Sequence, residues 1–203
     1  MGMQNMKDGT DQLVSFTFHQ MNIDEVYGIW SKTPKYVRET SFFYSYAQSV
    51  VIKSHVAEML FGRELAQAVA TSMASVCYTG VISDLVRRST PGIDDLERSI
   101  ARNIMIGSGC NPDLYDSEEL AAVVDMTRAI EHRDLDIDRR LASHLPNPQA
   151  LPSDIQDIIL RPMTQTEALQ AVRERCERDL FRGPNPLVIH NSNMIMPRES
   201  DAA

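Results

Sequence analysis

Two stretches combine histidine with carboxylates, the residue types that bind metal ions and transfer protons. His55 and Glu58 are three positions apart, so both would lie on one helical face. A helical di-metal site is built from Glu-x-x-His motifs with further glutamates, and the sequence contains no Glu-x-x-His motif. Residues 131–134, EHRD, bring acid, base and histidine together, but consecutive helical residues point to different sides. We therefore expect a structural polar pair at the first stretch and a solvated helix end at the second.

Cys110 is the cysteine best placed to be a nucleophile, because it lies with Asp113 in a predicted loop, GSGCNPD. A cysteine nucleophile needs a neighbouring base, and no histidine is close to it in the sequence. Gly107 and Gly109 resemble the start of a phosphate-binding loop, but no predicted strand precedes them and the rest of the fingerprint is absent. The sequence thus predicts no catalytic residue, no metal site and no cofactor.

The elements that would position any site centre on residues 62–81, where a small side chain recurs every fourth residue. This spacing puts the small side chains on one helical face, where another backbone can come close. The four residues of this small-residue ridge are Gly62, Ala66, Ala70 and Ala74. An apolar stripe beside the ridge consists of Leu65, Val69, Met73 and Val76. We interpret the segment as the central helix of the fold.

No residue forbids helix between Pro34 and Pro91, yet one helix over 34–88 would be about 80 Å long, roughly twice the diameter of a compact domain of this size. The chain must therefore kink or turn back, and Gly62 is the least costly position for either. In the stretch before Gly62, small or apolar residues recur at intervals that alternate between four and three positions, as in a coiled-coil seam. This seam consists of Phe43, Ala47, Val50, Ser54, Ala57 and Phe61. We favour a hairpin of two helices over a kink.

Capping signals mark the other helix starts. Asn22 with a glutamate three residues later has the spacing of a capping box, and so has Thr164. Thr33 followed by proline predicts a further start, because proline suits the first helical position. Asp94 and Asp116 are expected to cap two more helices.

The predicted fold is mainly α, a bundle of six to eight helices around the 34–88 pair. A short strand is expected at 13–18, where apolar and polar residues alternate. Three prolines within 146–152 indicate an internal linker. We divide the chain into an N-terminal arm (1–22), a helical core domain (23–145), Pro-bounded C-terminal helices (146–183) and an extended C-terminal tail (184–203).

Charge and composition narrow the range of partners. Of the 203 residues, 20 are basic and 28 acidic, which gives a net charge of −8, and no basic cluster is longer than two residues. Nucleic acid is therefore disfavoured, because duplexes prefer a basic surface. Residues 65–83 contain no charged side chain, but their hydroxyl and alanine content favours a buried core helix over a membrane span. The N-terminus lacks an export signal, and three cysteines without a CxxC pair suit a reducing, cytoplasmic compartment.

Features of protein contact outnumber features of chemistry. The ridge and the seam can pack in the chain's own core, which we favour, or on another chain, and the C-terminal tail carries the apolar residues Leu187, Ile189, Met194 and Met196. We therefore expect a non-enzymatic soluble adaptor or structural subunit of a secretion, conjugation or virion assembly, bound to identical or different protein subunits. Two alternatives stay open. One is a small-molecule-binding protein or enzyme with a cavity along 62–80; the other is a membrane-associated component that uses 65–83.

Overall fold

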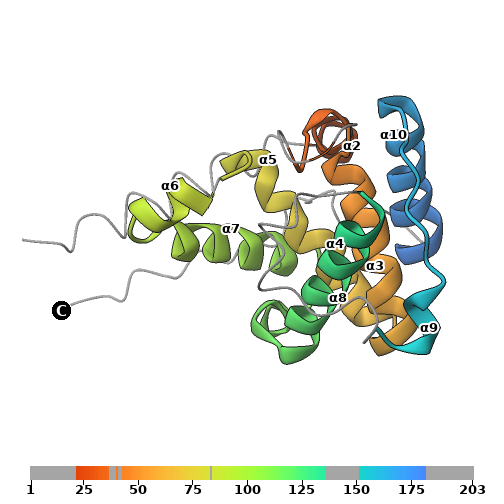
Figure 1. Cartoon of the computed structure of the whole chain (residues 1–203). Helices are drawn as coiled ribbons and strands as arrows, with labels where there is room; N and C mark the ends of the chain where they lie inside the picture. The colour runs from red at the N-terminus through yellow and green to blue at the C-terminus, as the bar shows by residue number, and fades with distance from the viewer. Residues whose placement is uncertain (1–21, 37–39, 41–42, 83, 136–150, 182–203) are drawn as a thin grey trace, which may run out of the picture.

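The computed structural model describes residues 22–36, 40, 43–82, 84–135 and 151–181, and these are mainly helical (Figure 1). The predicted mainly α class is confirmed. Within the described ranges no strand is present, and the only strand-like feature is an antiparallel bridge between Pro34 and Ser45. The strand expected at 13–18 and the C-terminal tail lie outside the described residues.

The first described helix, α2 (Ile23–Lys32), begins at the predicted capping box. The Asn22 side chain accepts a hydrogen bond from the Glu25 backbone at 3.0 Å, and the Glu25 carboxylate accepts one from the Asn22 backbone at 2.9 Å. Tyr27 and Trp30 on this helix are fully buried. α2 therefore has one face in the core from its first turn onward.

The prediction that a helix starts at Thr33 and Pro34 is wrong. Thr33 instead ends α2, because its hydroxyl donates back to the Ile29 carbonyl at 2.8 Å. The chain then forms a loop closed by two backbone hydrogen bonds of 2.9 Å, from Lys35 to Tyr44 and from Tyr46 to Thr33. A true capping box begins the next helix, α3 (Tyr46–Phe61), at Ser45. The helix thus begins at this side-chain cap, eleven residues after Pro34.

Gly62 is a turn between α3 and α4 (Arg63–Ser72). Its φ of 92° and ψ of 178° lie in a region that side chains other than hydrogen rarely allow. Beyond Gly62 the chain runs back beside α3. The end of α4 lies near the start of α3, as one hydrogen bond shows: the Trp30 indole, which packs beside the start of α3, donates to the carbonyl of Met73 at the end of α4 (3.2 Å). The two helices thus form a hairpin.

The uncharged stretch 65–83 is broken rather than continuous. After α4 come a 3-10 turn, η1 (Met73–Ser75), and the single turn α5 (Val76–Thr79), which ends at Gly80 with φ 67°. None of the helices that the structure describes is both long and apolar enough to cross a membrane.

A second group of helices follows. α6 (Asp84–Ser89) and the start of α7 (Ile93–Gly107) project to the left of the bundle in Figure 1. η2 (Pro112–Asp116) then leads into α8 (Glu118–Asp134). The predicted caps of these two helices are wrong by one or two positions. The N-cap of α7 is Gly92 instead of Asp94, and the N-cap of α8 is Ser117 instead of Asp116. The Ser117 hydroxyl accepts from the Leu120 backbone at 3.1 Å, which satisfies the helix start one residue later.

The C-terminal helices pack on the first ones. After α9 (Ser153–Gln156), α10 (Gln165–Arg173) begins at the predicted Thr164 capping box and lies against α2 and α3. It continues as a π-helix, η5 (Glu174–Leu180). Leu180 is the last residue of this helix, so its carbonyl has no partner within the helix, and it accepts hydrogen bonds from Arg63 (2.6 and 3.0 Å) and Gln67 (2.8 Å).

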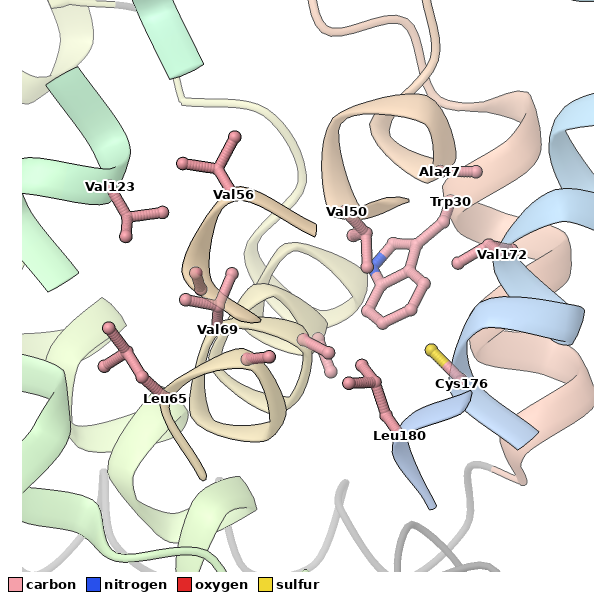
Figure 2. Packing of buried hydrophobic residues seen from close by; sticks show 14 of the residues in the cluster. Trp30, Ala47, Val50, Val56, Leu65, Val69, Val123, Val172, Cys176 and Leu180 are labelled. Atoms are coloured by element: carbon pink, nitrogen blue, oxygen red, sulfur yellow. The ribbon is translucent and has the colours of Figure 1, made fainter. Parts of the chain in front are cut away.

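The core surrounds the α3–α4 hairpin. Figure 2 shows the Trp30 ring among Val50, Val172, Cys176 and Leu180 on one side of the hairpin. In the same view Val123 of α8 lies on the side of the hairpin where Val56, Val69 and Leu65 are found. Elements from residue 26 to residue 181 thus share one hydrophobic cluster.

Candidate functional site

The small-residue ridge lies inside the chain's own core. Ala66 and Ala70 are fully buried and Ala74 is 2 % exposed, so their small side chains already pack against neighbouring helices. Gly62 serves the turn. Of the seam's two aromatic ends, Phe43 is half-buried and Phe61 is 43 % exposed. The other predicted contact residues, Leu187, Ile189, Met194 and Met196, lie outside the described residues.

The His55–Glu58 stretch and Cys110 have structural surroundings and form no reactive site among the described residues. Glu58 pairs with Arg175 of the π-helix at 2.6 Å rather than with His55, and Arg175 also donates to the hydroxyl and carbonyl of Ser54 at 3.0 and 2.8 Å. Among the described residues, no group of three or more metal-binding side chains comes together. Cys110 is half-buried, and burial raises the pKa of its thiol, so the thiol stays protonated at neutral pH.

Glu131 corrects one sequence-based expectation. We expected residues 131–134 to be a solvated helix end, but the Glu131 side chain is fully buried and α8 continues to Asp134. The reason is that α8 packs against α3, and Glu131 is on the side that meets it. A carboxylate in such a place must be compensated by charge and hydrogen bonds.

Four side chains supply that compensation, and together with Glu131 they form what we call the Glu131 cluster. The Lys35 ammonium lies 2.6 Å from both carboxylate oxygens. The hydroxyls of Tyr44 and Ser49 donate to Oε1 at 2.9 and 3.0 Å, and that of Tyr36 donates to Oε2 at 2.6 Å. Lys35 also donates to the Ser49 hydroxyl at 2.9 Å. The carboxylate therefore has five contacts for about four lone-pair sites.

The loop between α2 and α3 positions most of these donors. Its two backbone bonds bring Lys35 beside Tyr44, and the rings of Tyr36 and Tyr44 stack with centroids 6.0 Å apart. Ser49 lies in the first turn of α3, directly after the capping box. The cluster thus ties the loop, α3 and α8 together.

The electrostatics of the cluster favour an ionised carboxylate. Burial raises the pKa of Glu131, but the charges of Lys35 and Lys53 and the hydrogen bonds from Lys35 and Tyr36 outweigh it and hold the pKa below the ordinary value. Burial, with the charge of Glu131, raises the pKa of Tyr44 well above its ordinary value. At neutral pH the cluster therefore holds a carboxylate, and the Tyr44 phenol is neutral.

Lys53 completes the environment. It lies on α3 one turn after Ser49, and burial, followed by repulsion from Lys35, lowers its pKa to about 7. Strongly perturbed lysines next to other charges are a recurring feature of functional sites. The one signal for this cluster in the sequence was the concentration of lysine and tyrosine between residues 35 and 53. The carboxylate that accepts these hydrogen bonds belongs to Glu131, 78 positions beyond Lys53. Only the fold brings it to the lysine and the tyrosines.

Comparison of the chain with protein-family models and with curated proteins gave no match.

Proposed function

We propose that this chain is an adaptor or structural subunit of a larger protein assembly, and that α6 with the segment before it is one of its contact surfaces. The observation that carries the proposal is the exposure of Val81 (41 %) and Val86 (46 %) on a part of the fold that projects from the bundle (Figure 1). Covering such side chains in an interface removes apolar surface from water.

The local energetics of α6 support this proposal. α6 has six residues, whereas isolated helices shorter than about 12–15 residues are marginal in water. Arg87 joins it to α7 through ion pairs with Asp94 and Glu97, the latter at 2.7 Å. Exposed pairs of this kind contribute about 0–1 kcal/mol each. A partner that covers the two valines would therefore stabilise the helix as well as the complex.

The test compares Val86→Asp with Ile159→Asp, since Ile159 is also apolar and is 69 % exposed outside α6. Light scattering coupled to size exclusion gives the mass of each full-length chain. Self-assembly through α6 predicts that the unmodified chain has a mass that is a multiple of 22.9 kDa. The Ile159→Asp variant should keep this mass, and the Val86→Asp variant should be a monomer.

If the chain is a monomer, the same two variants are used as baits in a lysate of the native host. The proposal then predicts that partners bound by the unmodified chain are retained by Ile159→Asp and lost by Val86→Asp. Equal behaviour of both variants in both assays would contradict a contact surface at α6. Removing residues 187–203 tests the tail separately, because its apolar residues stay a prediction from the sequence.

A further inference from the structure

The last turn of α3 carries two apolar side chains that face water. Met59 is 42 % exposed and Phe61 is 43 % exposed, and Phe61 directly precedes the turn at Gly62. We call Met59 and Phe61 the α3-end patch. An apolar group that covered this patch would remove its surface from water, which is favourable.

The described part of the chain ends beside this patch. Arg63, two residues after Phe61, donates from its guanidinium to the Leu180 carbonyl at 2.6 and 3.0 Å. The next residue, Phe181, is the last of the described residues and is only 5 % exposed, so its ring is fixed in the core. The turn between α3 and α4 therefore holds the point from which the C-terminal tail continues.

The sequence that continues from this point matches the patch in character. Residues 183–186 are Gly-Pro-Asn-Pro, in which the two prolines prevent a helix from continuing and the dipeptides are typical of turns. Three consecutive apolar residues follow, Leu-Val-Ile at 187–189. The chain thus brings an apolar segment and an uncovered apolar patch to the same end of the molecule.

Chain length favours this patch over the larger exposure of Ile159, which is 69 %. An extended chain spans at most about 3.6 Å per residue, so Leu187 lies no more than roughly 22 Å from Phe181. The carbonyl of Arg161, two residues after Ile159, accepts from Gln48 in the first turn of α3. Because α3 is about 24 Å long, Ile159 lies toward the far end of it, whereas one arginine side chain joins the α3-end patch to the start of the tail.

We propose that residues 187–189 of this chain's own C-terminal tail bind the α3-end patch, and that this intramolecular contact covers both apolar surfaces while the chain is free. A partner that binds the tail uncovers Met59 and Phe61, so one binding event makes a second apolar surface available. The contact involves neither α6 nor the segment before it, and it therefore goes beyond the contact surface proposed above.

Thermolysin, which cleaves before large apolar residues, tests the contact on the full chain. Intact-mass spectrometry follows cleavage at 187–189 under native conditions, and circular dichroism checks the fold of each variant. We expect Phe61→Ser to speed this cleavage about tenfold, because cleavage follows the fraction of molecules in which the tail is released. Ile159→Ser, which changes an exposed apolar residue at the other end of α3, should leave the rate unchanged. Equal rates for the unmodified chain and Phe61→Ser would overturn the proposal.

The reciprocal variant changes the tail and leaves every described residue as it is, so it decides the question even where Phe61→Ser fails to fold. Val188→Asp should raise hydroxyl-radical oxidation of the α3-end patch about threefold, since the patch is then uncovered in more of the molecules. Peptide mass spectrometry measures this oxidation, with Ile159 as the internal control. Unchanged oxidation of the patch would contradict the proposal.

Dilution distinguishes the chain's own tail from the tail of a second copy. An intramolecular contact protects residues 187–189 equally at all protein concentrations. Protection that is lost on dilution would assign the patch to a second copy and overturn the intramolecular contact. Each of these measurements uses the isolated chain, so a negative result leaves the proposal for α6 intact.

Discussion

The protein pairs carboxylates with basic side chains in two networks, one buried and one exposed to solvent. In the Glu131 cluster, one lysine and three hydroxyls surround a carboxylate that is fully buried. On the surface, Arg98 and Arg102 of α7 contact Asp116 at 3.1 Å each, and the Asp116 side chain is 46 % exposed. All of these distances, from 2.6 to 3.1 Å, lie in the range of hydrogen-bonded contacts, so both networks are made of direct contacts.

What distinguishes them is the cost of breaking them. Water can replace either arginine at Asp116, so the pairs there contribute little net free energy. Water is excluded at Glu131, so losing one member leaves the others charged or unpaired in a medium of low dielectric constant. Three predictions test this contrast, in order of expected effect.

Glu131→Ala should have the largest effect on stability. The substitution leaves the Lys35 ammonium and the hydroxyls of Tyr36, Tyr44 and Ser49 without their acceptor. We expect the free energy of unfolding to fall by about 3–5 kcal/mol, measured by urea denaturation followed by circular dichroism. A loss below about 1 kcal/mol would show that the buried cluster is no stronger than the surface network.

Lys53→Met should remove a pH dependence of stability. Folded Lys53 has a pKa of about 7, against an ordinary value of 10.5, so between these values unfolding takes up a proton and stability rises with pH. The gradient is at most about 1.4 kcal/mol per pH unit. The stability of the unmodified chain relative to Lys53→Met should therefore increase from pH 7 to pH 10 and be constant below pH 6. Lys32→Met is the matched control, and identical pH profiles for all three proteins would contradict the prediction.

Asp116→Ala should have the smallest effect. Its two arginine partners keep other contacts, since Arg102 also pairs with Asp113 at 2.9 Å and both arginines are partly exposed. We expect a loss below about 1 kcal/mol in the same denaturation assay, which 0.5 M salt reduces further. A loss comparable to that of Glu131→Ala would remove the distinction between the two networks.

The local features of the fold could be predicted from the sequence. The capping boxes at Asn22 and Thr164 lie where they were expected, because side chains three residues apart bond to each other's backbone without help from the rest of the chain. The glycine between the two central helices was identified for a similar reason, since its positive φ is a local property. The amino acid sequence by itself thus determined the helical class, several helix starts and the position of the central turn.

The Glu131 cluster was decided by the tertiary structure. The four residues 131–134, EHRD, would form a solvated helix end if α8 stood alone, as their sequence predicts. Only the packing of α8 on α3, and the loop that replaces the helix expected at Pro34, bring Lys35 to Glu131 across 96 positions of sequence. Whether a carboxylate is solvated or buried depends on which surfaces meet, and neither composition nor periodicity contains that information.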